Sequence, residues 1–257
     1  MIDVHSHILP GIDDGASCIE QAIEMAKIAQ QENITKIIST PHYLGEGQDA
    51  SKESILKAAK LLNQSCVDNG IDIDILVGQE LYANINLLED IKNNNVLPLA
   101  NTDFLLIEFP MMSLPSWADD ILHGIMVLGY KPVIAHPERY GYVINNPDIV
   151  KEWINMGCFT QINSMSITGR FGSKVQKVVK ELATRDMIHL LGTDSHSHRG
   201  RSPKVQDSIS LLKNWIGTKD AKMVVDNGFR LLENQELVTK VPQTKRNKFV
   251  SFLKRIL

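Results

Sequence analysis

The 257-residue chain has an ordinary composition, with 43% hydrophobic and 22% charged residues and a net charge of −3. This near-neutral charge gives no electrostatic argument for nucleic-acid binding, and no stretch reaches the roughly 18 apolar residues of a membrane span. The three cysteines are few and widely spaced, which argues against a disulfide framework and against a cysteine-based zinc site. Because the N-terminus also lacks the basic region and apolar run of a signal peptide, we expect a cytoplasmic protein.

Hydrophobic patterning predicts a regular alternation of strands and helices along the chain. Strands are expected over residues 1–7, 34–40, 73–78, 104–107, 131–135, 158–162 and 187–191. Helices are expected over residues 17–32, 51–68, 86–93, 116–128, 146–157, 172–185, 203–215 and 219–226. Ser17, with Glu20 three residues later, is typical of a capping box at the start of the first helix.

The seven predicted strands are almost continuously apolar, as expected of parallel strands covered by helices. We therefore predict an α/β fold in which the strands form a closed parallel (β/α) barrel, with an open doubly wound sheet as the alternative. No change of composition marks a linker, so residues 1–241 are expected to form a single domain. Residues 242–257 differ from the rest, because they carry five Lys or Arg residues and no acid.

The first predicted strand ends in His5-Ser6-His7. Side chains two residues apart on an extended strand point to the same side, so the two imidazoles can bind one cation. A single His-x-His sequence often occurs by accident. Its value therefore depends on whether other strands end in similar residues.

Other strands do end in polar residues: His42, Glu80, Glu108, His136, Asn163, Asp194 and His196. The carboxyl ends of the strands of a parallel barrel meet at one rim, so we expect these side chains to converge with His5 and His7. Asp14, in the loop after the first strand, can join them. Imidazole and carboxylate without thiolate suit Mn, Fe, Zn or Mg, and the number of ligands favours a multinuclear cluster.

Arginines near this rim indicate a phosphorylated substrate. Arg139 follows His136 by three residues, and Arg201 lies in the loop after the last strand, close to Arg199. A guanidinium group can bind two phosphate oxygens at once, so we favour a functional role for Arg139 and Arg201. Three other histidines fall outside the pattern. We assign structural roles to His123 and His189. His198 is interpreted as a loop bystander, with a substrate contact as the alternative.

Five separated motifs resemble those of the polymerase and histidinol phosphatase superfamily: Asp3-Val4-His5-Ser6-His7, Thr40-Pro41-His42, Gly78-Gln79-Glu80, Ala135-His136-Pro137-Glu138-Arg139 and Thr193-Asp194-Ser195-His196. The first loop and the His-Pro-Glu-Arg motif are more specifically similar to the manganese-dependent bacterial tyrosine phosphatases of capsule and exopolysaccharide loci, the CpsB, CapC and YwqE group. The resemblance covers residues 1 to about 235 and implies a distorted seven-stranded barrel.

The resemblance also implies three bound metal ions, with manganese expected and iron, zinc, magnesium or cobalt as substitutes. It assigns the first metal to His5, His7, Glu80 and Asp194. Glu80 would bridge to a second metal, which Glu108 and His136 also hold, and the third metal would be held by Asp14, His42 and His196. Arg139 and Arg201 match the arginines that the family uses for phosphate, although the sequence leaves the choice between Arg199 and Arg201 open.

We expect the protein to hydrolyse phosphotyrosine on a protein, such as a bacterial tyrosine kinase of capsule synthesis, by in-line attack of a metal-bound hydroxide. A cysteine-dependent mechanism would need an arginine six positions after a cysteine. The residues at those positions are Glu24, Asp72 and Ser164.

Three alternatives stay open from the sequence. One is a histidinol-phosphate phosphatase or another small-molecule phosphatase. A second, a proofreading nuclease, is disfavoured by the near-neutral charge. The third is a non-catalytic, metal-stabilised regulatory or binding subunit. The tail is interpreted as a terminal helix or a solvated end, or alternatively as a contact with an anionic membrane surface or a membrane-bound kinase.

Overall fold

Parallel strands dominate the computed structural model, which describes residues 1–45, 47 and 49–243. One sheet contains three strands in the order β1 (Ile2–Ser6), β2 (Lys36–Ser39) and β4 (Asp74–Val77). The other contains six strands in the order β3 (His42–Tyr43), β5 (Glu80–Tyr82), β6 (Phe104–Glu108), β7 (Lys131–Ala135), β8 (Phe159–Asn163) and β9 (Leu190–Gly192). Every strand pair is parallel.

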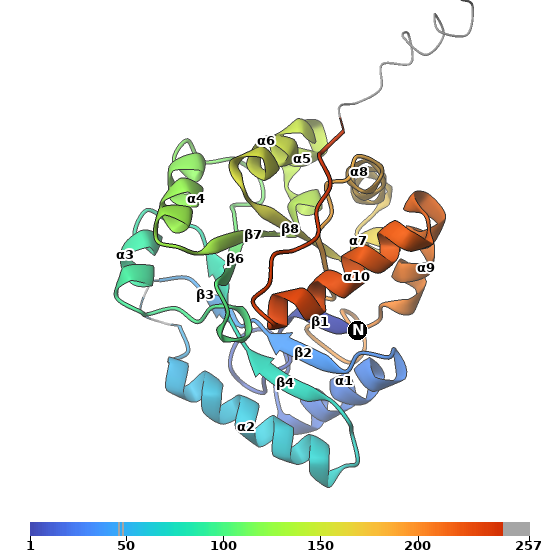
Figure 1. Cartoon of the computed structure of the whole chain (residues 1–257). Helices are drawn as coiled ribbons and strands as arrows, with labels where there is room; N and C mark the ends of the chain where they lie inside the picture. The colour runs from blue at the N-terminus through green and yellow to red at the C-terminus, as the bar shows by residue number, and fades with distance from the viewer. Residues whose placement is uncertain (46, 48, 244–257) are drawn as a thin grey trace, which may run out of the picture.

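The two sheets are parts of one barrel, because two of the seven predicted strands are bent and change sheets (Figure 1). β2 continues into β3 through Pro41, which has no N–H for the sheet ladder. β4 continues into β5 through Gly78, whose N–H donates to the carbonyl of Ser39 at 2.8 Å. A Cβ atom at Gly78 would lie 3.0 Å from the side chain of Leu99 and 3.1 Å from its Cα atom, so a larger residue at this bend would press against Leu99.

The last strand meets the first and closes the barrel. Ser6 and Ser195 form a parallel bridge, and the N–H of Asp194 donates to the carbonyl of His5 at 2.7 Å. The buried carboxylate of Asp3 accepts both the N–H of Thr193, at 2.8 Å, and its hydroxyl, at 2.5 Å. Burial raises the pKa of Asp3 to about 6 against the opposing effect of these bonds. The predicted seven-stranded distorted barrel is confirmed, and the open sheet is wrong.

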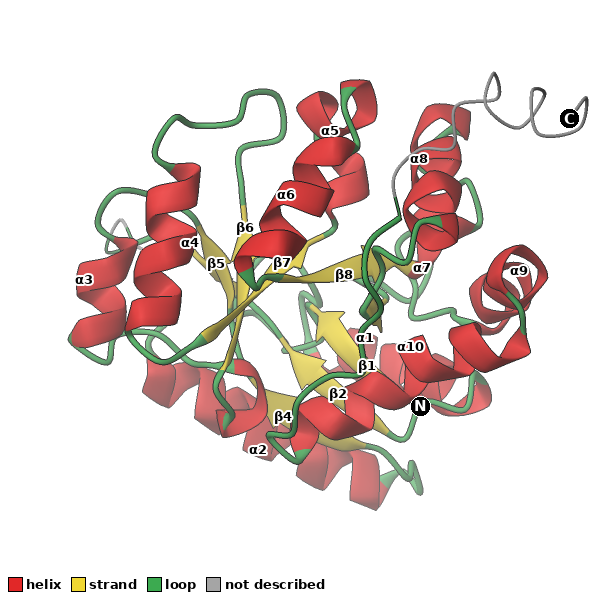
Figure 2. Ribbon diagram, turned by 45° about the horizontal axis from the view of Figure 1, so that its top comes forward, coloured by secondary structure: helices red, strands yellow, loops and turns green. Residues whose placement is uncertain are grey.

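Helices cover the outside of the barrel (Figure 2). They are α1 (Ile19–Gln31), α2 (Lys52–Asp68), α3 (Leu87–Lys92), α4 (Ala118–Val127), α5 (Gly141–Asn145), α6 (Asp148–Met156), α7 (Ser164–Ile167), α8 (Ser173–Thr184), α9 (Gln206–Ile216) and α10 (Thr218–Leu232), with 3-10 turns η1 (Leu99–Asn101) and η2 (Pro137–Arg139). None of these helices is long and apolar enough to cross a membrane.

Several predicted boundaries are wrong. The short helices α5 and α7 were not expected, and α10 runs six residues past its predicted end. The capping box is absent, because Cys18 is the N-cap of α1 and Ser17 instead donates to the side-chain oxygen of Gln21. Of residues 242–257, only Pro242 and Gln243 are described, so the prediction of a basic amphipathic tail concerns residues outside the described part of the chain.

An apolar layer fills the interior of the barrel below the carboxyl ends of the strands. It includes Val4, Ile38, Leu106, Val133 and Leu190, which come from strands on opposite sides of the barrel. Because side chains alternate along a strand, the inward positions that follow next are polar on several strands. The interior therefore changes from an apolar floor to a polar mouth.

The histidine His189 is structural, as expected from the sequence. It is buried beside Thr160, whose N–H donates to its Nδ1 atom at 3.1 Å. This bond fixes Nδ1 as an acceptor and leaves the ring neutral. Burial lowers the pKa of His189 to about 4.

Replacing His189 with asparagine should make the metal-free protein less sensitive to acid, while keeping an acceptor for Thr160. The folded state keeps His189 neutral down to about pH 4, whereas the unfolded chain binds the proton near pH 6.5. Stability is therefore lost as pH falls through this window, and the His189 contribution between pH 7 and pH 5 is about 2 kcal/mol. Urea unfolding at pH 7 and pH 5 gives the loss of unfolding free energy in each protein, and this loss should be smaller in the variant by about 2 kcal/mol. Equal losses in both proteins would contradict the assignment.

Candidate metal centre

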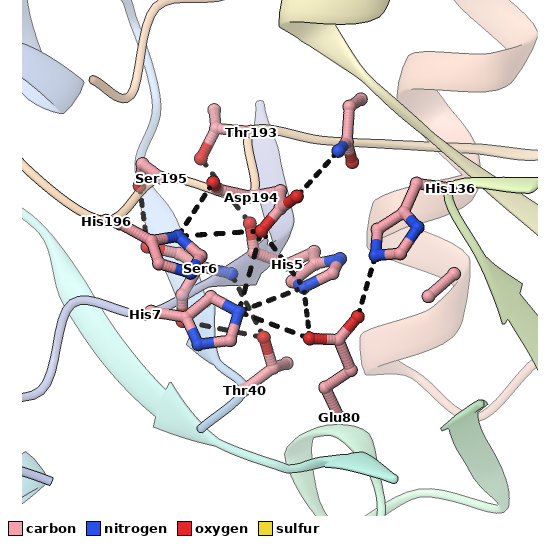
Figure 3. A network of polar contacts seen from close by, with 12 residues as sticks. His5, Ser6, His7, Thr40, Glu80, His136, Thr193, Asp194, Ser195 and His196 are labelled. Atoms are coloured by element: carbon pink, nitrogen blue, oxygen red, sulfur yellow. Dashed lines mark hydrogen bonds and ion pairs between the residues drawn. The ribbon is translucent and has the colours of Figure 1, made fainter. Parts of the chain in front are cut away.

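All nine predicted metal ligands lie together at the carboxyl ends of the strands. Figure 3 shows the part of the cluster formed by His5, His7, Glu80, His136, Asp194 and His196. The nine residues form four overlapping groups in which the potential ligand atoms lie within 4.8 Å of one another. The groups are His7, Asp14, His42 and His196; His5, His7 and Glu80; His5, His136 and Asp194; and His42, Glu80 and Glu108. The convergence that the sequence predicted is therefore present in the structure.

Glu80 lies at the centre of the cluster. Its Oε2 atom is 3.3 Å from the Nε2 atoms of both His5 and His7, and these two nitrogens are 3.2 Å apart. Its Oε1 atom is 2.9 Å from Nε2 of His136. Its Oε2 atom also lies 3.2 Å from Nδ1 of His42, so Glu80 faces four histidines. This position is compatible with the bridging role that the family resemblance implies.

Asp13 orients His7, a role that the sequence analysis missed. Its Oδ2 atom lies 2.7 Å from Nδ1 of His7, and its Oδ1 atom accepts the N–H of Gly15 at 3.0 Å. A Cβ atom at Gly15 would collide with the carbonyl of His7 at 1.9 Å, so only glycine permits this loop path. The acidic pair Asp13-Asp14 was a visible signal, but its spacing does not reveal which acid faces inward.

The arrangement of donor atoms fits a cation. With Asp13 bound to Nδ1 of His7, the Nε2 lone pair faces Glu80 and His5 in a region closed to solvent. Three electron-pair donors at about 3 Å from one another, without a positive charge between them, would repel. Imidazole and carboxylate oxygen are together suitable ligands for divalent transition metals.

The cluster is open to solvent at one end. His5 and Glu80 are fully buried, whereas Asp14 is 65% exposed. The Oδ1 atom of Asp14 lies 3.5 Å from Nε2 of His42 and 3.4 Å from Nε2 of His196. A substrate can therefore reach the cluster from the side of Asp14, His42 and His196.

Close packing of charge shifts the pKa of several of the predicted ligands. Burial alone would lower the pKa of His7, but Asp13 and Glu80 together raise it to about 10. Burial and the charge of Glu80 raise the pKa of Glu108 to about 8. Burial opposes ionisation of Glu80, yet the surrounding histidines hold its pKa well below the usual value. Without metal, the cluster therefore keeps protons at positions that a cation would occupy.

Two of the predicted ligands have left-handed backbone conformations. His136 has φ 31° and Asp194 has φ 52°, although neither is glycine. Such conformations cost on the order of 1–3 kcal/mol and concentrate at functional sites. No sequence pattern signals them.

Both predicted phosphate-binding arginines reach the cluster. Nη1 of Arg139 donates to Oδ2 of Asp194 at 2.8 Å, and Nη2 of Arg201 lies 2.5 Å from Oδ1 of the same carboxylate. Arg199 is exposed and its Nε donates to His198. The geometry thus favours Arg201 over Arg199, which the sequence left open. His123, exposed on α4, and His198 take no part in the four groups.

Comparison with known proteins gives one consistent family. Residues 1–233 match the model of the CpsB/CapC family of capsular polysaccharide synthesis. The chain is 33% identical to the tyrosine-protein phosphatase YwqE of Bacillus subtilis, over 98% of this chain and 100% of that protein. It is 32% identical to the putative tyrosine-protein phosphatase CapC of Staphylococcus aureus, over 94% of this chain and 95% of that protein.

Solved structures agree with the sequence comparison. Crystal structures of YwqE from B. subtilis and CpsB from Streptococcus pneumoniae, described as metal-dependent tyrosine phosphatases, match with a TM-score of 0.92 and 32% identity, over 96% of this chain and 100% of that chain. A histidinol phosphate phosphatase from Lactococcus lactis matches with a TM-score of 0.55 and 16% identity, over 86% of this chain and 93% of that chain. At this identity the second likeness concerns the fold alone.

Metal binding should release a proton from Glu108. With a pKa of about 8, Glu108 holds a proton at pH 7 in the metal-free protein, and a bound cation requires the carboxylate. Metal affinity should therefore rise with pH toward 8. Calorimetry of Mn²⁺ binding at pH 7, in buffers of different ionisation enthalpy, measures the number of protons released. Glu108→Gln should release about one proton fewer than the wild type. The exposed Glu233→Gln serves as control, and an unchanged proton count in Glu108→Gln would refute the prediction.

Proposed function

Because the chain belongs to the CpsB/CapC family of capsular polysaccharide synthesis, we propose that it is a metal-dependent protein-tyrosine phosphatase. The observation that carries this proposal is the convergence of nine imidazole and carboxylate ligands beside two arginines. The relatives that share almost the whole chain length are tyrosine phosphatases, which favours phosphotyrosine on protein as the substrate.

We assign the nine clustered side chains to a centre of three metal ions, with manganese as the expected metal. Bound divalent cations would lower the pKa of water and polarise the phosphoryl group. Asp14, His42 and His196 would hold the metal at the open end, where His7 also contributes a nitrogen. Glu80 would bridge in the buried part, between His5 and His7 on one side and His136 on the other.

Arg139 and Arg201 are proposed to bind the phosphoryl oxygens. Each is partly exposed and has a guanidinium group at the cluster through its contact with Asp194. A planar guanidinium can bind two oxygens of the transferred group, and its charge stabilises the negative charge on the equatorial oxygens in the transition state. The aromatic ring of Phe171 lies 4.9 Å from the guanidinium carbon of Arg139 and restricts its orientation.

No cysteine is placed for a covalent mechanism. Cys66 and Cys158 are buried, and burial raises the pKa of Cys66 and raises that of Cys158 to about 12. The exposed Cys18 caps α1 and belongs to none of the four ligand groups. Hydrolysis would thus need no phosphoenzyme on cysteine.

The alternatives have weaker support. Likeness to a histidinol phosphatase extends only to the fold, and the net charge of −3 gives no basis for a nuclease. A non-catalytic subunit would not need to retain all nine ligands and both arginines. The family's connection with capsule synthesis favours a tyrosine-phosphorylated protein of that process, such as a bacterial tyrosine kinase, as the partner. Membrane contact through the tail stays a prediction.

Manganese-loaded protein should hydrolyse a phosphotyrosine peptide at least about 100-fold faster, in kcat/KM, than histidinol phosphate, a difference of about 3 kcal/mol in transition-state binding. Excess EDTA should abolish this activity because it removes the cations, whereas iodoacetamide should have little effect because two cysteines are buried and the third lies outside the ligand groups. Phosphate release assays measure both effects. Full activity in EDTA would exclude the metal mechanism, and faster turnover of histidinol phosphate would exclude the substrate assignment.

The two neighbouring arginines should separate in a mutational test. Arg201→Ala should lower kcat/KM for a phosphotyrosine peptide by about 100-fold, because one charged donor to the phosphoryl group is lost. Arg199→Ala, at an exposed position, should change it by less than about threefold. Steady-state kinetics at saturating Mn²⁺, with metal content measured on both variants, gives the comparison. The reverse order of effects would reassign the phosphate contact to Arg199.

A further inference from the structure

Two buried amide side chains on β8 connect two ligands of the metal centre. Nδ1 of His5 lies 2.8 Å from Oε1 of Gln161, and Nε2 of Gln161 donates to Oδ1 of Asn163 at 2.9 Å. Nδ2 of Asn163 then donates to Oδ2 of Asp194 at 2.7 Å. The result is an unbroken hydrogen-bonded chain from a ligand on the first strand to a ligand after the last strand.

The direction of this chain is set by Asp194. Its carboxylate faces Arg139 and Arg201 and can only accept hydrogen bonds. Asn163 must therefore present its NH₂ group to Asp194 and its oxygen to Gln161. Gln161 must then use its own NH₂ group for Asn163, so its oxygen is left facing His5.

The orientation of Gln161 determines the tautomer of His5. An amide oxygen only accepts, so Nδ1 of His5 carries the proton, and the neutral ring keeps its lone pair on Nε2. That Nε2 atom is the one that faces His7, Glu80 and Asp194. With the opposite amide orientation, Nε2 would carry the proton and could not bind a metal.

We propose that Gln161 and Asn163 are positioning residues of the metal centre, which hold His5 in its metal-binding tautomer and fix the orientation of Asp194. The hydrogen bonds described for their side chains join them to His5, to each other and to Asp194. This role rests on one part of the proposed function, namely that the cluster binds metal.

Local packing supports a dedicated arrangement. Gln161 and Asn163 are both completely buried and lie two residues apart on β8, so both point into the barrel. A Cβ atom at Gly192 would lie 2.7 Å from Cβ of His5 and 2.8 Å from Nε2 of Gln161, so glycine on β9 leaves room for their contact. The N–H of Asn163 donates to Glu138 at 3.0 Å, which also fixes the end of β8.

The arrangement is costly unless it is complete. A buried amide without partners costs on the order of 1–3 kcal/mol, and β8 buries two amides side by side. Aliphatic side chains would fill this space without that cost, as Leu106 and Val133 do lower in the barrel. Stability alone therefore gives no reason for amides here, whereas ligand positioning does.

Gln161→Met tests the proposal, because it removes the hydrogen bonds while keeping the side-chain length. The dissociation constant for Mn²⁺, measured by chelator competition, should rise by about 10- to 100-fold. Gln161→Glu keeps an acceptor for His5, so its dissociation constant for Mn²⁺ should rise by less than about tenfold. This smaller effect would be a partial rescue. The control is Gln176→Met, because Gln176 on α8 bonds only to the carbonyl of Ile167 among the contacts described for its side chain. It should leave Mn²⁺ affinity within about threefold of the wild type.

A second measurement does not depend on any variant folding. In zinc-loaded wild-type protein, ¹⁵N NMR should show His5 with a slowly exchanging proton on Nδ1. Metal on Nδ1 would overturn the proposal, as would wild-type Mn²⁺ affinity in Gln161→Met. Neither readout requires turnover. Metal binding with the expected tautomer but without phosphotyrosine hydrolysis would therefore contradict the proposed function and leave this inference supported.

Discussion

The contact between the first and last strands is the interaction on which the rest of the structure depends. Asp3 accepts two hydrogen bonds from Thr193, which lies 190 positions further along the chain. The same seam carries the bond from Asp194 to the carbonyl of His5. Because His5 lies on one side of the seam and Asp194 on the other, the metal centre can assemble only when the barrel closes. Barrel stability and ligand geometry are therefore set by the same few contacts.

The floor of the barrel explains how so much charge can be concentrated above it. Leu106 and Val133 fill the interior, and the next inward position on β6 is Glu108. The apolar layer buries hydrophobic surface inside the barrel, so the predicted ligands above it do not need to supply that burial. Without cations the mouth is unfavourable, as the raised pKa of Glu108 indicates. Cation binding would offset this cost, and would also balance the left-handed backbone at His136 and Asp194.

The sequence predicted the parts of this structure that follow from strand periodicity. Cluster residues such as Glu80 and His136 could be predicted, because polar residues at the ends of apolar strands must meet at one rim. The supporting contacts could not be found in this way. Asp13 is adjacent to an equally acidic residue, and Gln161 lies inside a strand where an amide has no distinctive spacing. Short helices such as α5 could not be predicted, because a helix of about one turn has too little hydrophobic periodicity to detect.

The two histidines of the first strand have different partners, and burial accounts for the difference. His7 is oriented by the carboxylate of Asp13, near the open end of the cluster. Solvent and the N–H of Gly15 help to stabilise the negative charge of Asp13 there. His5 lies in the closed part beside Glu80 and Asp194, where a further carboxylate would add an unscreened negative charge. An amide gives the same hydrogen bond to Nδ1 without that charge. The NH₂ group of Gln161 can also donate to the oxygen of Asn163, which keeps the NH₂ group of Asn163 directed at Asp194. A carboxylate in place of Gln161 could not donate this hydrogen bond.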